Sequence, residues 1–131
     1  MAELKDSGTR QVYFTGANRD NRAGKGRMDL LPPSAMLRLS RHFEDGARKY
    51  GDNNWQKGIP ISNYINSALR HLFKYLAGCN DEPHLEAAAW NILCAMWTEQ
   101  ELPEMQDIPT WKGRTSNFLY PLDMEISSKP S

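Results

Sequence analysis

The chain has 131 residues, a length that predicts one domain with a single hydrophobic core. Its 16 Lys and Arg residues balance its 16 Asp and Glu residues, so the formal net charge is zero. A neutral chain has no general attraction for a polyanion, which argues against nucleic acid or a membrane surface as the main partner. A small polyphosphate bound with a metal ion remains compatible, because a few local charges are enough to hold it.

The cysteines and the hydropathy pattern favour the cytoplasm. Cys79 and Cys94 lack the spacing of metal ligands, and Cys94 lies in an apolar helical run that predicts a buried thiol. Two cysteines do not indicate a disulfide framework. The N-terminus lacks the apolar core of a signal peptide, and no apolar run approaches the roughly 20 residues that cross a bilayer.

Residues 1–33 are predicted to form an extended arm. They are rich in Gly, Arg, Asn and Asp and end at two consecutive prolines. We expect this arm to become ordered by docking on the body or on a partner subunit. Its only strand-like run, over residues 11–15, is short, and no segment of the chain shows convincing strand alternation.

Three helices are predicted to follow the arm. The first begins at Ser34, an N-cap after the prolines, and ends at Gly51. The second begins near Ser62 and ends at Gly78, and the third runs from about residues 81–83 to Glu101. The apolar residues at helical spacing, expected to face the core, are Met36, Leu39, Phe43, Ala47 and Tyr50, then Ile65, Ala68, Leu69, Leu72 and Leu76, then Leu85, Ala88, Ala89, Ile92 and Met96.

The expected fold is therefore all-α, with one domain over residues 1–131. It consists of the arm 1–33, a helical core 34–101 and a loop-rich tail 102–131, which contains four prolines. Trp111, Phe118 and Tyr120 are expected to pack the tail down. Three helices of about seventeen residues make a thin core, so a fourth element or a partner subunit is expected to complete the bundle.

Helical phase sorts the acidic residues. Glu44 lies beside the apolar stripe of the first helix, whereas Asp45 lies nearly opposite it. Glu82 and Glu86 are four residues apart on one flank of the third helix. Two helices packed side by side would bring Glu44 next to this pair. Converging carboxylates make a hard-oxygen site suited to Mg²⁺ or Mn²⁺.

Each of these residues also has a simpler interpretation. Asp81 and Glu82 can cap a helix start, and Glu44 can pair with an arginine one turn away on its own helix. A single histidine such as His71 or His84 is more often a hydrogen-bonded packing residue than a ligand. Composition and spacing alone thus predict an α-helical domain and leave the metal site open.

Five sequence blocks in a fixed order go beyond composition. They are Gly24–Pro32, Glu44–Gly51, Asn54–Pro60, Ser67–Leu72 and His84–Asn91, and they include GARKYG, NWQKG and ALRHL. In this order, over about residues 15–110, the chain resembles the bacteriophage dATP/dGTP diphosphohydrolases, which are related to the MazG-like all-α NTP pyrophosphatases.

The resemblance implies a MazG-like helical bundle that works as a homodimer or homotetramer with Mg²⁺ or Mn²⁺. The implied substrate is a purine (deoxy)nucleoside triphosphate, dGTP or dATP. It would be cleaved between the α- and β-phosphates to the monophosphate and pyrophosphate. This activity would serve phage nucleotide metabolism in the cytoplasm of the infected host cell.

Acid placement and motif order together predict the site. The expected catalytic residues are Glu44, His71 and Glu82, with one carboxylate or His71 as general base. The expected metal ligands are Glu44, Asp81, Glu82 and Glu86. The expected substrate-binding residues are Lys25, Arg27, Lys49, Asn54, Trp55, Lys57, Arg70, His84 and Asn91. Among them, Lys49, Lys57 and Arg70 would balance phosphate charge, and Trp55 would stack on the base.

The chain also departs from the wider MazG-like pattern, which pairs E-x-x-E on one helix with E-x-x-D on another. Glu44 has no glutamate three positions away, and Asn91 stands where an aspartate is expected. A nucleotide-binding or helical interaction module that does not hydrolyse its ligand is therefore the alternative function.

Overall fold

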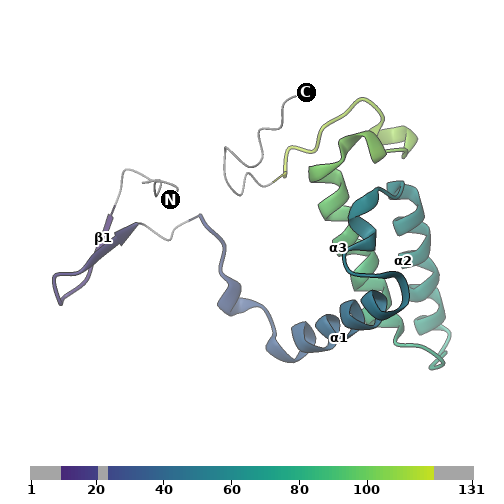
Figure 1. Cartoon of the computed structure of the whole chain (residues 1–131), viewed down its shortest axis with the longest axis horizontal. Helices are drawn as coiled ribbons and strands as arrows, with labels where there is room; N and C mark the ends of the chain where they lie inside the picture. The colour runs from purple at the N-terminus through teal and green to yellow at the C-terminus, as the bar shows by residue number, and fades with distance from the viewer. Residues whose placement is uncertain (1–9, 21–23, 120–131) are drawn as a thin grey trace. The chain divides into compact units, whose positions relative to one another are not determined.

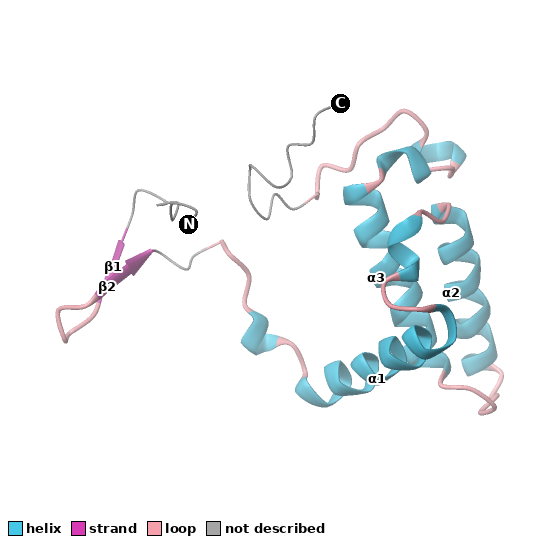
Figure 2. Ribbon diagram, in the orientation of Figure 1, coloured by secondary structure: helices cyan, strands magenta, loops and turns pink. Residues whose placement is uncertain are grey.

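The computed structural model describes residues 10–20 and 24–119. The chain divides into two units, Met1–Pro33 and Ser34–Ser131. In the first unit, β1 (Arg10–Val12) and β2 (Asn18–Asp20) pair as an antiparallel hairpin, with Gln11 opposite Arg19 (Figure 2). The sequence pattern did not predict this hairpin, because its three-residue strands are too short to show alternation.

The second unit is built from α1 (Pro33–Tyr50), α2 (Ile61–Leu76) and α3 (His84–Glu101) (Figure 1). Figure 1 shows α2 and α3 side by side, with α1 running across them. Short 3₁₀ turns lie at Asn54–Lys57 (η2), Pro103–Met105 (η3) and Pro109–Trp111 (η4), and a further one, Met28–Leu30 (η1), lies in the first unit. The predicted all-α fold is confirmed.

Glycines mark two of the helix ends as predicted. Gly51 has a φ of +93°, and its N–H donates to Ala47 O at 2.8 Å, which closes α1. Gly78 has a φ of +83°, and the N–H of the next residue, Cys79, donates to Lys74 O at 3.0 Å. This left-handed conformation satisfies the last carbonyls of a helix and stops it.

The core lies between α2 and α3. Its buried members are Ile61, Tyr64, Cys94 and Ala95. Burial raises the pKa of the Cys94 thiol to about 12, and the side chain is only 1% exposed, so the predicted buried thiol is confirmed. Tyr64 donates its hydroxyl proton to the backbone oxygen of Trp55 at 3.2 Å, which ties η2 to this core.

The predicted core faces are wrong for most of their large residues. The structure buries Ile61, Tyr64 and Ala68 on α2 and mainly small residues on α3. The residues predicted to be buried that are instead more than a third exposed are Met36, Tyr50, Ile65, Leu69, Leu72, Leu76, Leu85, Ile92 and Met96. Both α2 and α3 carry two apolar faces. On α3, the face that packs within the chain carries mainly small side chains, which allow the two helices to approach closely.

The large apolar residues of a second face of the α2–α3 pair are each more than a third exposed. We call it the apolar face; it consists of Ile65, Leu69, Leu72 and Leu76 on α2 and Leu85, Ile92 and Met96 on α3. Among the described residues, no helix has the length and apolar character needed to span a membrane.

The described part of the tail packs only partly. Trp111 is 40% exposed and lines one hollow together with Ile61 and Ile108. Phe118 is 92% exposed, so the prediction that it packs the tail down is wrong. The third residue of that prediction, Tyr120, lies outside the described residues.

Candidate functional site

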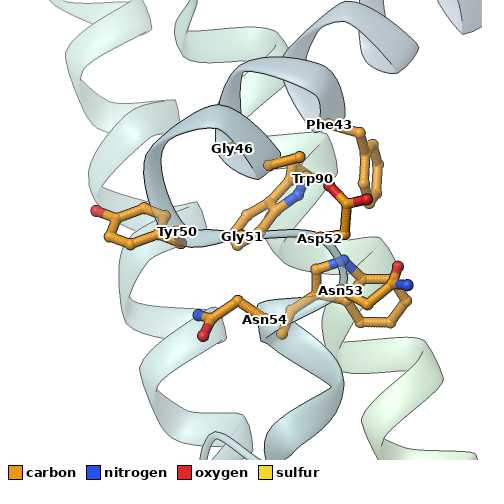
Figure 3. A pocket seen from close by; sticks show the side chains of 10 residues that line it. Phe43, Gly46, Tyr50, Gly51, Asp52, Asn53, Asn54 and Trp90 are labelled. Atoms are coloured by element: carbon orange, nitrogen blue, oxygen red, sulfur yellow. The ribbon is translucent and has the colours of Figure 1, made fainter.

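An aromatic pocket opens between the end of α1 and η2 (Figure 3). It has a volume of about 170 Å³. Its walls are lined by Phe43, Gly46, Ala47, Tyr50, Gly51, Asp52, Asn53, Asn54, Trp55 and Trp90. All but two of these residues come from the contiguous stretch 46–55, so the sequence block with the highest density of polar and aromatic groups forms one concave surface.

Ring packing and backbone turns hold this pocket in shape. The Trp55 ring meets Trp97 edge-on with centroids 5.0 Å apart, and Phe43 with centroids 6.2 Å apart. Asn53 sits in the left-handed region at φ +56°, which asparagine tolerates better than most residues, and its carbonyl accepts the Gln56 N–H at 2.9 Å. Ring contacts thus anchor Trp55, and the turn fixes the backbone of Asn53 at the pocket.

Three polar side chains stand at the pocket, from Asp52, Asn53 and Asn54. Figure 3 shows the Asp52 carboxylate pointing toward the rings of Phe43 and Trp90. Asn54 and Trp55 thus lie where a nucleoside could contact them. Asp52 was missed by the sequence reasoning, although it stands inside the block that carried the prediction.

The predicted phosphate-binding lysines lie on either side of the pocket residues. Lys49 places its ammonium 5.1 Å from the centre of the Tyr50 ring, a cation–π contact. Lys57 closes η2 and is exposed. The residue after it, Gly58, has a φ of +109°, and a Cβ there would meet the Met105 sulfur at 3.6 Å. Glycine is thus required by the backbone conformation of this turn.

A second group of residues gathers where α2 approaches the start of α3. We call it the acid–histidine cluster; it consists of His71, Asp81, Glu82 and His84. Ligand atoms of His71, Glu82 and His84 lie within 4.8 Å of one another. Nδ1 of His84 is 2.9 Å from Nδ1 of His71, and Nε2 of His84 is 2.9 Å from Oδ1 of Asp81.

These contacts restrict the proton positions in the cluster. A carboxylate only accepts, so Nε2 of His84 carries the proton that bonds to Asp81, and this hydrogen bond lowers the pKa of Asp81. In the contact between the two histidines, one Nδ1 atom carries a proton and the other accepts it. Burial lowers the pKa of His71, and the opposing charge of Glu82 does not reverse this. The lowered pKa favours the neutral form of His71.

Glu86 lies next to the cluster but is held by a different helix. Nη2 of Arg38 on α1 donates to Oε1 of Glu86 at 2.8 Å, and this hydrogen bond lowers the pKa of Glu86. Both residues line a hollow of about 190 Å³ together with Glu82 and His84. Sequence reasoning missed Arg38, because a contact 48 residues away leaves no local signal.

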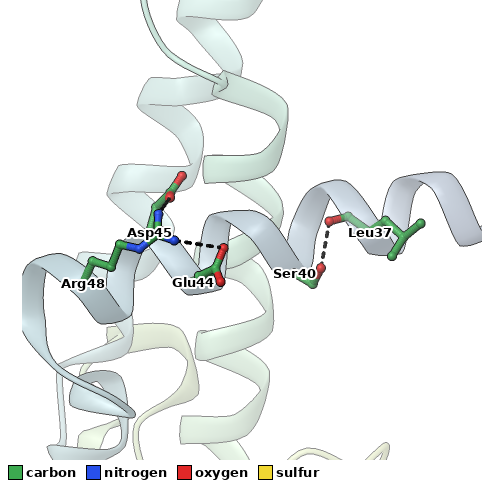
Figure 4. A network of polar contacts seen from close by, with 5 residues as sticks. All are labelled: Leu37, Ser40, Glu44, Asp45 and Arg48. Carbon is green, nitrogen blue, oxygen red and sulfur yellow. Dashed lines mark hydrogen bonds and ion pairs between the residues drawn. The ribbon is translucent and has the colours of Figure 1, made fainter.

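Glu44 lies elsewhere. Its side chain is 61% exposed and pairs with Arg48 at 3.5 Å, one turn along α1 (Figure 4). Asp45 also pairs with Arg48, at 3.4 Å, and faces solvent as predicted. Glu44 does not line the hollow that holds Glu82 and Glu86. In this single chain its contact is thus the one that the simpler interpretation described, an ion pair within its own helix.

The remaining predicted residues have varied surroundings. Asn91 is buried, and its amide donates to Ala87 O at 2.8 Å within α3, while Arg70 is exposed on α2. Arg27 lies in the first unit, as does Lys25, and makes two hydrogen bonds to Asp29 at 2.8 and 2.7 Å. Of all the predicted residues, the structure brings together His71, Asp81, Glu82 and His84 at one place and Asn54 with Trp55 at the other.

The donors near the cluster fit a divalent cation. Asp81, Glu82 and Glu86 offer carboxylate oxygens, which suit Mg²⁺ or Mn²⁺. Both ring nitrogens of His84 are already engaged, so this buried side chain, 3% exposed, orients its neighbours rather than offering a lone pair.

The structure is thus all-α, with an aromatic pocket at residues 46–55 and a cluster of acids and histidines where α2 approaches α3. The family model described as dATP/dGTP diphosphohydrolase, N-terminal, matches residues 15–108. The chain therefore belongs to this family, whose name describes hydrolases of purine deoxynucleoside triphosphates, and the predicted family is confirmed. No curated protein and no solved structure matches the chain.

Proposed function

We propose that the chain hydrolyses dGTP or dATP between the α- and β-phosphates and releases the monophosphate and pyrophosphate in phage nucleotide metabolism. One observation carries the proposal: in this member of the family, a ring nitrogen of His71 and a carboxylate oxygen of Glu82 lie within 4.8 Å of each other beside the buried His84. A cluster of this kind suits metal-assisted hydrolysis, and the aromatic pocket suits the base.

The metal site is proposed at Glu82, with Asp81 and Glu86 as further ligands to Mg²⁺ or Mn²⁺. Glu86 would bind the ion either while keeping its ion pair with Arg38 or after that ion pair is broken. Glu44 would join only by leaving its partner Arg48. A bound ion supplies neutralisation of phosphate charge and a lower pKa for an attacking water.

His71 is proposed as the general base. In the tautomer whose Nδ1 donates to His84, Nε2 of His71 would accept a proton from the water that attacks the α-phosphorus in line. The Asp81–His84 pair would hold the ring in the required tautomer. Lys49, Lys57 and Arg70 would balance charge on the leaving pyrophosphate, and Lys25 and Arg27 are proposed as further substrate-binding residues.

The test is incubation of the protein with each dNTP and Mg²⁺ or Mn²⁺, followed by separation of the products. We expect dGMP or dAMP with pyrophosphate. Release of orthophosphate would refute the cleavage position, and metal-dependent binding without turnover would support the non-hydrolysing alternative. Glu82→Gln should abolish most turnover, whereas Glu44→Gln decides whether Glu44 is a ligand in the working enzyme.

We also propose that the working form is a homodimer or homotetramer assembled through the apolar face. On α2 this face has the 4-3-4 spacing of Ile65, Leu69, Leu72 and Leu76, which makes a continuous seam. The same seam from a second copy would turn the α2–α3 pair into a four-helix bundle. Leu72→Glu should give a monomer in sedimentation experiments, whereas Leu37→Glu, at an exposed apolar position on α1, should not.

A further inference from the structure

We infer that the aromatic pocket selects guanine over adenine and that Asp52 makes this selection. The inference rests on the proposed function, because it assumes that the pocket receives the base of the substrate. It goes further by assigning one of the two purines and the side chain that reads its edge.

The pocket has the shape of a site for a flat ring. Its volume is about 170 Å³, and its lining includes the aromatic residues Phe43, Trp55 and Trp90. Aromatic walls stack on any base, because every base has a π-face. These rings therefore supply affinity but do not distinguish guanine from adenine, and discrimination must come from the polar groups.

Asp52 is the charged group among the residues that line the pocket. Its carboxylate points toward the rings of Phe43 and Trp90 (Figure 3). Within the described residues, this carboxylate has no ion pair or hydrogen bond, in contrast to Asp81 and Asp107. It therefore has its full accepting capacity available for a ligand.

Guanine fits this carboxylate and adenine does not. Guanine presents two adjacent donors on one edge, N1–H and the 2-amino group, which two carboxylate oxygens accept together. Adenine presents the lone pair of N1 beside a single 6-amino donor, so one carboxylate oxygen would face a lone pair.

The test is the ratio of kcat/KM for dGTP and dATP in the unmodified protein and in Asp52→Asn. We expect the unmodified protein to favour dGTP by about 10- to 100-fold, the discrimination typical of one bidentate contact. Asp52→Asn should remove or reverse this preference, because a carboxamide offers one donor and one acceptor, the pattern of the adenine edge. dITP, which keeps N1–H but lacks the 2-amino group, should fall between the two.

Asp45→Asn is the matched control, since Asp45 is an exposed aspartate of α1 outside the pocket. It should keep the dGTP preference. An unchanged preference in Asp52→Asn would overturn the inference, and so would an equal loss for both purines, which would indicate a structural or metal-binding role.

Binding of dGMP and dAMP, followed by the fluorescence of the tryptophans at the pocket, separates this inference from the proposed function. If no triphosphate is hydrolysed but Asp52→Asn still reverses the dGMP preference, hydrolysis is refuted and the guanine site stands. If dGTP is hydrolysed but Asp52→Asn changes neither the kcat/KM preference for dGTP nor the binding preference for dGMP, the guanine site is refuted and hydrolysis stands.

Discussion

The aromatic pocket and the acid–histidine cluster are built by different forces. The pocket comes mostly from one contiguous stretch, residues 46–55, and ring contacts such as Trp55 on Trp97 hold it in shape. The cluster joins α2 to the start of α3 through directed hydrogen bonds around the buried His84. Apolar packing fixes the shape of the aromatic pocket, whereas hydrogen bonds hold the acid–histidine cluster together.

This difference suggests a division of labour. Stacking in the pocket acts equally on the bound substrate and on the transition state, so it should govern KM. In the proposed mechanism the cluster would act on the reacting phosphate, so it should govern kcat. Both regions share α3, which carries Trp90 at the pocket and His84 in the cluster. A substitution in the pocket should therefore change mainly KM, and a substitution in the cluster mainly kcat.

The largest effect is expected from His71→Gln. Loss of the proposed base should lower kcat by about 10²- to 10⁴-fold, the usual contribution of general base catalysis, with little change in KM. Steady-state kinetics with dGTP and a fixed Mn²⁺ concentration measure both constants.

The matched control for His71→Gln is His42→Gln, at a half-buried histidine of α1 that packs edge-on against Trp90 at 6.2 Å. This substitution should leave kcat close to that of the unmodified protein. A rise in KM in His71→Gln with kcat preserved would contradict the division of labour, because it would place His71 in substrate binding.

A smaller effect, on KM rather than on kcat, is expected from Tyr50→Ala. Tyr50 lines the aromatic pocket but is 59% exposed, so its removal should not disturb the core. Loss of one stacking surface should raise the KM for dGTP by about 10-fold and leave kcat nearly unchanged. An unchanged melting temperature would show that the fold is intact. A fall in kcat alone would mean that the pocket takes part in the chemical step.

Local signals explain what could be predicted from the sequence. The ends of α1 and α2 followed from Gly51 and Gly78, because glycine at a positive φ stops a helix without reference to the rest of the chain. The pocket residues Asn54 and Trp55 were predicted for the same reason, since the whole motif is contiguous. Asp52 was overlooked there because its direction depends on the turn at Gly51.

Properties that depend on how helices pack could not be predicted. Helical phase placed Glu44 toward Glu82, but periodicity does not say which of two apolar faces a helix buries. The contact between His71 and His84 likewise depends on the register of α2 against α3. Neither register nor choice of face has a signature within one helix, so both required the structure.

The smallest effect is expected from substitution of Asp107, which belongs to neither the aromatic pocket nor the acid–histidine cluster. Its carboxylate accepts the Ser62 N–H at 2.9 Å and also the Ser62 hydroxyl, which caps the first turn of α2. These hydrogen bonds lower the pKa of Asp107. A carboxyl whose pKa is lower in the folded than in the unfolded protein stabilises the fold at pH above its unfolded pKa of about 4. That contribution is lost as the pH falls through the lowered folded pKa.

Asp107→Ala should therefore lower the melting temperature at pH 7 by about 5 °C, the change typical of a lost helix cap, with kcat and KM unchanged. The difference from the unmodified protein should shrink below about pH 4, because the protonated carboxyl no longer accepts both hydrogen bonds. Asp107→Asn, which keeps one accepting oxygen, should fall between the two proteins. Thermal unfolding at pH 7 and pH 3 measures all three, and a melting difference independent of pH would show that the carboxylate charge does not stabilise α2.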